Sequence, residues 1–276
     1  MRIVLAIVAL VIAAAAASVI DGSSKWNRST AERVARLSPS TPGVAVYHEA
    51  MLAGLPPPAL RYFRRVLRDG QPIVRSAVAR QEAEFFINGA WRPLRASQDF
   101  VAAPPGFVWD ARITMAPLVP AYVRDSYVNG VGTMTASILG VYTLVDQQAI
   151  PELNAGALQR FLAEAVWLPT ALLPSPAVTW SPRDDRSAVA TLRDSSTKVS
   201  MTFDVDPEGL VTSINGDRFK ESGGNYTVQP WQVRCDEYRD RDGMLIPLHC
   251  EVAWITDGRP EPYWRGRITS VSYRYN

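Results

Sequence analysis

The chain opens with an unbroken apolar run, and shorter alternating segments follow it. Residues 3–20 carry no charge, with Arg2 before them and Asp21 after them. A helix needs roughly 20 apolar residues to cross a bilayer, so the run is just long enough. Its basic start and its small residues 13–17 also fit a cleaved secretory signal. Residues 1–20 are therefore a signal peptide or a membrane anchor, and either one places the remainder in the cell envelope, membrane-anchored or periplasmic.

Alternating apolar and polar positions predict strands over most of the remaining chain. Asn-Gly dipeptides at residues 88–89 and 129–130 mark hairpin turns. A further turn about residues 206–209 sets Met201 opposite Ile214. Consecutive hairpins need no crossover helices, so the pattern predicts an antiparallel sheet of about ten or eleven strands.

Two cysteines flank the dipeptide Asp242-Gly243, which strongly favours a two-residue hairpin turn. Pairing the strands about this turn sets Cys235 opposite Cys250, with an apolar face on one side and matched charges on the other. In an oxidising compartment this predicts a disulfide that contributes about 3 kcal/mol; two buried free thiols are the alternative. The other facing pairs are Trp231 with Trp254, Val233 with Val252, Arg234 with Glu251 and Asp236 with His249.

Helical patterns interrupt the strands at residues 56–68 and 150–173. The segment 21–54 is predicted to be a tether that contains a short helix at residues 30–37. Without residues 1–20 the chain has about 250 residues, the size of one large domain or two small ones, and no repeat or low-complexity linker divides residues 55–276. The expected fold is a single α+β domain, an antiparallel β-rich open half-barrel packed on helices.

Three motifs resemble an uncharacterised bacterial envelope family, a domain of unknown function. They are PPGFVWDA at residues 104–111, LAEAVWLPTALLP at residues 162–174 and YWRGRI at residues 263–268, and the likeness runs from about Leu55 to the C-terminus. More remotely, the order of elements resembles the lipoprotein-carrier fold of LolA and LolB, an unclosed antiparallel barrel curled over helices. This resemblance implies an architecture and no mechanism.

Several aromatic and charged side chains are candidates to line a cavity inside the half-barrel. On the second predicted helix an arginine, a glutamate and a tryptophan at i, i+4 and i+7 either hold a polar headgroup or form an ordinary ion pair beside packed tryptophan. On the strand 107–115, Asp110 and Arg112 share the face opposite Trp109 and lie either in the cavity or on the solvent side. The predicted ligand-binding residues are Trp109, Asp110, Arg112, Arg160, Glu164, Trp167, Trp264 and Arg265.

The first predicted helix carries a basic stripe formed by Arg61, Arg64, Arg65 and Arg68. A basic amphipathic helix after a membrane segment suits anionic lipid headgroups, with roughly 1 kcal/mol from each arginine near the surface. A solvated face on a helix that packs by its apolar side is the alternative.

The chemistry that the sequence supplies favours binding over catalysis. A net charge of +2 gives no general attraction to nucleic acid. The two histidines, His48 and His249, supply neither a zinc site nor a triad. The predicted function is the binding of a lipid or other apolar small molecule, without metal or cofactor. The alternatives are an interaction domain for an envelope protein, and a hydrolase that pairs Glu164 with Asp110 or Asp185.

Overall fold

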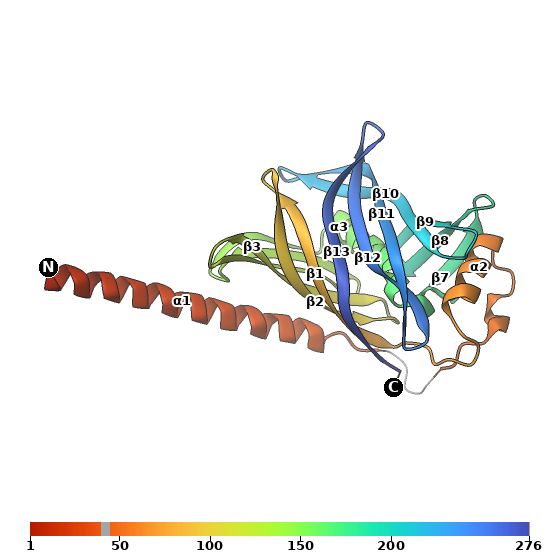
Figure 1. Ribbon diagram of the computed structural model, residues 1–276, viewed down its shortest axis with the longest axis horizontal. Helices are drawn as coiled ribbons and strands as arrows, with labels where there is room; N and C mark the ends of the chain where they lie inside the picture. The colour runs from red at the N-terminus through yellow and green to blue at the C-terminus, as the bar shows by residue number, and fades with distance from the viewer. Residues whose placement is uncertain (40–44, 276) are drawn as a thin grey trace.

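A single antiparallel sheet dominates the computed structural model, which describes residues 1–39 and 45–275 (Figure 1). Its thirteen strands follow the order β6-β5-β4-β3-β2-β1-β13-β12-β11-β10-β9-β8-β7, so the N-terminal strand β1 and the C-terminal strand β13 meet in the middle. The predicted antiparallel sheet is confirmed, with more strands than expected. The strands are β1 Ser76–Ile87, β2 Ala90–Val101, β3 Gly106–Ala116, β4 Val119–Val128, β5 Val131–Ile138, β6 Tyr142–Gln148, β7 Val178–Pro182, β8 Ser187–Asp194, β9 Thr197–Val205, β10 Val211–Ser222, β11 Asn225–Arg241, β12 Met244–Thr256 and β13 Arg259–Arg274.

The sheet curls until its two halves touch, while its edge strands β6 and β7 stay unpaired with each other. The Tyr127 hydroxyl on β4 donates a hydrogen bond of 2.8 Å to Asp194 on β8. Gly130, in the turn after β4, packs so closely on Ser195 that a Cβ there would lie 2.7 Å from the Ser195 Oγ. The result is the predicted open half-barrel, curved around helix α3.

Helix α3 (Pro151–Glu164) fills the concave side of the sheet, and helix α2 (Pro57–Val66) covers one end of it. Leu158, Phe161 and Leu162 on α3 are almost fully buried, and each such side chain contributes roughly 1.5–3 kcal/mol. The predicted helix at residues 150–173 is shorter in the structure and ends at Glu164. Pro169 cannot donate an amide hydrogen and disfavours helix before it, so the chain continues as the short 3-10 helices η2 (Ala165–Trp167) and η3 (Pro169–Leu172).

One continuous helix, α1 (Arg2–Ala35), replaces the predicted apolar segment and the separate short helix at residues 30–37. It has 34 residues and is therefore about 51 Å long, well beyond the roughly 30 Å of a bilayer's hydrocarbon core. Its first half projects away from the domain (Figure 1). Its second half lies on the convex face of the sheet, where the Trp26 indole donates to Asp110 at 3.1 Å and the Thr30 hydroxyl donates to Asp110 at 2.8 Å.

The predicted tether at residues 21–54 is therefore not a free linker. Residues 21–35 belong to α1, and residues 40–44 lie outside the described residues. Beyond them Tyr47 is buried, and its amide donates to the Gln71 carbonyl at 2.8 Å. Leu52 in the 3-10 helix η1 (Glu49–Leu52) is also buried, so this stretch packs as part of the domain.

A close backbone contact fixes α1 on the sheet and leads to a testable expectation. A Cβ at Gly22 would lie 2.7 Å from the Gly140 carbonyl oxygen in the turn between β5 and β6. Gly22→Val is therefore expected to lift α1 from the sheet at a cost of about 1–3 kcal/mol. Hydrogen exchange of residues 22–35 should rise, whereas Ala31→Val, at an exposed position of the same helix, should leave it unchanged. Equal exchange in the two variants would contradict this packing.

Candidate functional site

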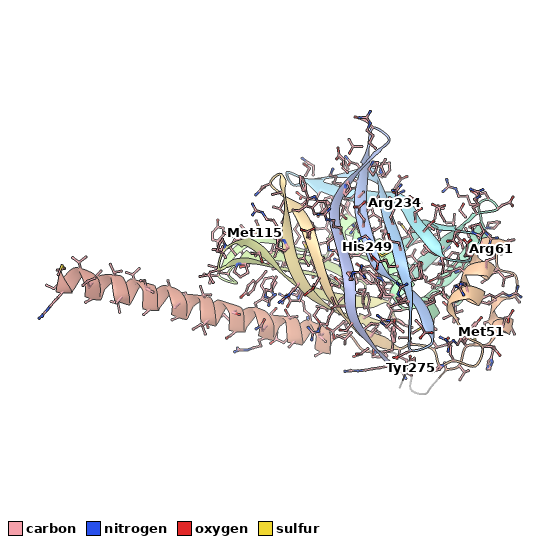
Figure 2. The ribbon with its side chains drawn as sticks, in the orientation of Figure 1. Met51, Arg61, Met115, Arg234, His249 and Tyr275 are labelled. Atoms are coloured by element: carbon pink, nitrogen blue, oxygen red, sulfur yellow. A yellow bond between two sulfur atoms is a disulfide. The ribbon has the colours of Figure 1, made fainter. Side chains whose placement is uncertain are left out.

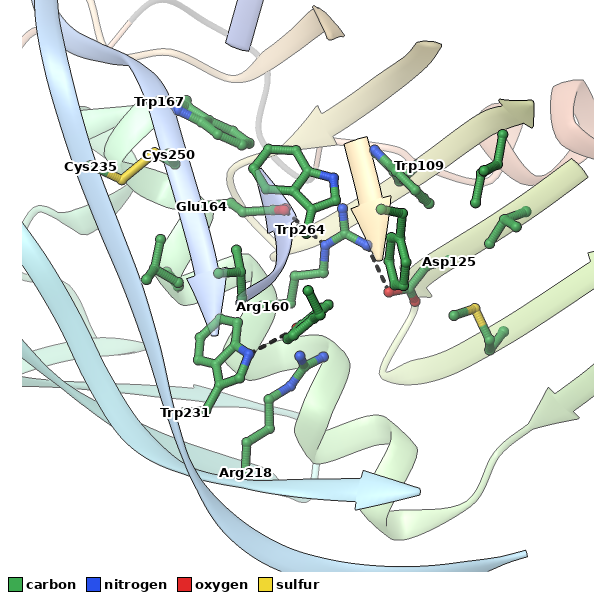
Figure 3. Close-up of a pocket in the computed structure, with 18 of the residues that line it drawn as sticks. Trp109, Asp125, Arg160, Glu164, Trp167, Arg218, Trp231, Cys235, Cys250 and Trp264 are labelled. Carbon is green, nitrogen blue, oxygen red and sulfur yellow. Dashed lines mark hydrogen bonds and ion pairs between the residues drawn. A yellow bond between two sulfur atoms is a disulfide. The ribbon is translucent and has the colours of Figure 1, made fainter. Parts of the chain in front are cut away.

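The concave face of the sheet and α3 line a partly open cavity of about 280 Å³ (Figure 3). This volume is near the lower end for small-molecule sites, which run from about 300 to 1,000 Å³. Most of the wall is apolar, with contributions from both halves of the sheet, from α3 and from η2. The aromatic residues of the wall are Phe85, Trp109, Trp167, Trp231, Tyr263 and Trp264.

Strand alternation places one half of this wall. Strands β11 and β12 pair about Asp242-Gly243 in the predicted register, with Cys235 opposite Cys250, and the two cysteines form a disulfide. Successive side chains of a strand point to opposite faces, so every second residue of β11 reaches the concave side. Trp231, Val233 and Cys235 accordingly line the cavity together, and the predicted disulfide is confirmed as part of its wall.

A buried cluster of charges interrupts the apolar wall. The Arg160 guanidinium on α3 donates to Glu164 at 2.8 Å, one helical turn further on, and to Asp125 on β4 at 2.8 Å. Its centre lies 5.2 Å from the Phe107 ring and 4.8 Å from the Trp109 ring, within the range of a cation–π contact. One cation therefore stands against two carboxylates inside a largely apolar cavity (Figure 3).

A chain of hydrogen bonds links this cluster to the central strands of the sheet. The Gln98 amide on β2 donates to Glu164 at 2.7 Å, and the Gln81 amide on β1 donates to Gln98 at 3.0 Å. The Trp109 indole on β3 donates to Gln81 at 2.8 Å. Both glutamines are buried, so each bond also satisfies a group that water cannot reach. The network holds the Glu164 carboxylate and the Trp109 ring in place from three strands.

The electrostatics of the cluster follow from burial and from the excess of acid. Burial raises the pKa of Glu164 above its ordinary range, and the negative charge of the nearby Asp125 raises it further. Arg160 and Gln98 lower this pKa but offset only part of the rise. Burial also disfavours the charge on Arg160, but Glu164 and Asp125 outweigh this and raise the pKa of Arg160. Arg160 therefore stays protonated, and Glu164 keeps its proton to a higher pH than an ordinary glutamate.

The raised pKa of Glu164 predicts a pH dependence of stability. Below about pH 4.3 the carboxyl is protonated in both the folded and the unfolded chain. Above that pH the unfolded chain releases the proton first, so the contribution of Glu164 to stability falls until its folded pKa is passed. Chemical unfolding from pH 4 upward should show the wild type losing stability relative to Glu164→Gln. A difference that stays constant or runs the other way would contradict the raised pKa.

Two polar atoms of the wall have no hydrogen-bond partner among the described residues. They are the Asp125 Oδ1 and the Trp167 Nε1, both buried. An unpaired buried polar group costs about 1–3 kcal/mol, so the wall carries an unsatisfied polar cost beside the charge cluster. Arg218 adds a positive group to the wall, with its guanidinium 4.9 Å from the Trp231 ring. The cavity can therefore hold an apolar body and pair with a polar group.

Five predicted ligand-binding residues reach the cavity wall, and three do not. Asp110 and Arg112 lie on the convex face, where Arg112 pairs with Asp110 and donates to Asn27 of α1 at 2.8 Å. Arg265 forms an ion pair of 2.7 Å with Glu84, outside the cavity. These three residues do not line the cavity because each follows an inward-facing tryptophan by an odd number of strand positions. The residues brought together are Trp109, Arg160, Glu164, Trp167 and Trp264.

The structure does not bring together the carboxylate pairs expected of a hydrolase. Glu164 faces the cavity, whereas Asp110 contacts α1 on the other side of the sheet. Asp185 lies exposed in the turn between β7 and β8, where its carbonyl accepts from Arg61 of α2 at 2.9 Å. The acid that meets Glu164 is Asp125, and Arg160 stands between the two.

The basic stripe of α2 is engaged with the protein itself. Arg61 donates to Asp185, Arg64 pairs with Glu49 at 2.7 Å, and Arg68 pairs with Asp240 at 2.8 Å. Arg65 packs with its Cβ within reach of Gly209. Helix α2 also lies at the end of the domain away from the first half of α1 (Figure 1), so these arginines lie at the opposite end from the projecting segment.

Sequence reasoning missed Asp125, Gln81 and Gln98. Asp125 follows Ala121 and Val123 in the inward phase of β4, and a carboxylate in that phase is the signal that identifies it. The two glutamines likewise occupy apolar phases of β1 and β2. A polar residue at an inward position is costly unless it is paired, so such positions mark a buried network.

Known proteins place the chain in a family without a known function. Residues 53–273 match DUF6920, a family of unknown function. The chain belongs to DUF6920. The predicted membership of an uncharacterised family is thereby confirmed, and no curated protein matches this DUF6920 chain.

Solved structures resemble the DUF6920 chain in architecture. One is a domain from Vibrio parahaemolyticus described as an outer membrane lipoprotein-sorting protein, with 8% identity, a TM-score of 0.42 and coverage of 72% of this chain and 85% of that one. Another is a DUF1329 family protein from Desulfovibrio piger, with 7% identity, a TM-score of 0.42 and coverage of 78% and 90%. Likeness at this level concerns the fold alone.

Proposed function

We propose that the chain binds a lipid, or another apolar molecule with a polar group, in the cavity between the sheet and α3. The observation that carries the proposal is the buried cluster of Arg160, Asp125 and Glu164 in an otherwise apolar wall. A buried ion pair is a weak source of stability, and apolar residues of similar volume often serve a core as well. Its position at a cavity is therefore better explained by a ligand whose polar group it meets.

The chain acts at a membrane, to which α1 anchors it. Helix α1 is long and apolar enough to cross a bilayer by its length and composition. Its second half is packed on the domain through Trp26 and Thr30, which favours the anchor over the cleaved signal. The domain then stands beside a supply of lipid, on the extracytoplasmic side of the membrane.

Fluorescence quenching by a brominated fatty acid tests the cavity directly. Trp109, Trp167, Trp231 and Trp264 line it, so a bromine on the acyl chain should quench a large part of the emission of the full chain in detergent. Ala136→Phe fills the cavity from β5 and should abolish this quenching. Ser200→Phe, at an exposed position of β9, is the matched control, and the fatty acid should quench its emission as much as that of the wild type.

Equal quenching of the wild type and the Ala136→Phe variant would show that the fatty acid binds elsewhere. No quenching of the wild type at any concentration below the onset of fatty-acid micelles would exclude an acyl chain as the ligand. Circular dichroism of each variant confirms that the sheet is retained.

A further inference from the structure

Large apolar side chains are exposed at one end of the sheet. Leu118, in the turn between β3 and β4, is 95% exposed, and Tyr142, at the start of β6, is 69% exposed. The two turns adjoin, because the Leu139 amide after β5 donates to the Pro120 carbonyl of β4 at 3.0 Å. We name this set the apolar rim, and its members are Leu118, Val141, Tyr142 and Leu144.

Helix α1 leaves the domain at the apolar rim. Its contacts run along the convex face in order, from Gly22 at Gly140 to Trp26 at Asp110 and on to Arg33, which donates to Thr133 at 2.9 Å. Residues before Gly22 therefore project past the hairpin that carries Val141 and Tyr142. In Figure 2, Met115 near the end of β3 lies at the end of the domain towards the projecting half of α1, whereas Arg61 lies at the other end.

The length of the projecting half fits the thickness of a bilayer. Residues 3–20 rise about 27 Å as a helix, close to the roughly 30 Å hydrocarbon core. If that segment spans the bilayer, the membrane surface lies near Gly22. The Gly22–Gly140 contact then sets the apolar rim at the level of the lipid headgroups, where tyrosine side chains are enriched.

We propose that the apolar rim inserts into the headgroup region of the bilayer that α1 spans. This inference rests on the membrane anchoring proposed above and names the surface of the domain that meets the membrane. Burial of four apolar side chains that water now contacts provides the driving force.

Site-specific fluorescence in vesicles tests the proposal. The two native cysteines are joined in a disulfide, so a cysteine introduced elsewhere takes a thiol-reactive fluorophore alone. Leu118→Cys and Tyr142→Cys place an environment-sensitive dye on the apolar rim, and Glu208→Cys, exposed in the turn after β9 beside α2, is the matched control. Each full-length variant is reconstituted in phosphatidylcholine vesicles, with or without lipids that carry a nitroxide near the headgroup.

The dyes at residues 118 and 142 should shift to shorter wavelength and be quenched severalfold more than the dye at residue 208. Equal, water-like emission at all three positions would overturn the proposal. Binding of brominated fatty acid by the same samples is measured separately. Rim dyes that stay in water while the cavity binds fatty acid would reject the insertion of the rim and leave the proposed function standing. Quenched rim dyes without fatty-acid binding would support the insertion of the rim and reject the proposed function.

Discussion

Replacement of Arg160 with alanine is expected to lower the free energy of unfolding by about 3–5 kcal/mol. The variant leaves Asp125 and Glu164 buried without the cation that each contacts at 2.8 Å. It also removes the contacts of the guanidinium with the Phe107 and Trp109 rings. A loss of this size is a large part of the 5–15 kcal/mol that typically stabilises a domain.

Urea unfolding of the full chain in detergent, followed by circular dichroism, measures this loss. Arg265→Ala is the matched control, because it breaks a half-exposed ion pair with Glu84 and should cost about 0–1 kcal/mol. The triple variant Arg160→Met, Asp125→Asn, Glu164→Gln should recover much of the stability, since it removes the unpaired charges together. Similar losses in Arg160→Ala and Arg265→Ala would contradict a charge cluster shielded from water.

Removal of the disulfide is expected to cost about 3 kcal/mol, because the bond closes a loop between cysteines 15 residues apart. The double variant Cys235→Ala, Cys250→Ala should unfold at lower urea concentration than the oxidised wild type. Addition of a reductant should shift the wild type to the midpoint of the variant and leave the variant itself unchanged. Thiol titration verifies that the reduction is complete. An unfolding midpoint of the fully reduced wild type that does not shift would contradict the expected stabilisation.

The sequence specified the β11–β12 hairpin in detail because its turn admits a single register. Asp242 and Gly243 both have positive φ values, of 50° and 81°, as a two-residue turn of the favoured type requires. Every predicted pair in this hairpin is present, from Trp231 opposite Trp254 to Asp236 opposite His249. Two turn residues and the strand alternation were sufficient to place the disulfide.

The β9–β10 hairpin shows where such reasoning fails. The turn at residues 206–209 predicted Met201 opposite Ile214, but Ile214 pairs with Phe203. The pairing begins with Val211 opposite Val205, which is one residue from the predicted register, and an irregularity between Val211 and Ser213 adds a second residue, which a longer turn does not exclude. A bulge is stabilised by the strands on both sides of it, which a local pattern does not contain.

The candidate site was predictable only where a single element defines it. The stripe of Arg160, Glu164 and Trp167 follows from helical spacing, and all three reach the cavity. Alternation set Asp110 on the face opposite Trp109, but a local pattern does not tell which face is concave or that α1 covers the other, since Trp26 and Asp110 are 84 positions apart. Contacts at this separation arise from the tertiary fold, so the sequence left the face of the strand that holds Asp110 undecided.

Native mass spectrometry of the full chain, purified from membranes and released from detergent, tests the lipid-binding claim most directly. The account predicts a bound molecule on the wild type that lipid extraction identifies, retained by Ser200→Phe and lost from a folded Ala136→Phe variant. A wild type that carries no bound molecule, and takes up none after incubation with a membrane extract, would contradict the claim. The exposed apolar surface would then be better explained by an envelope protein partner.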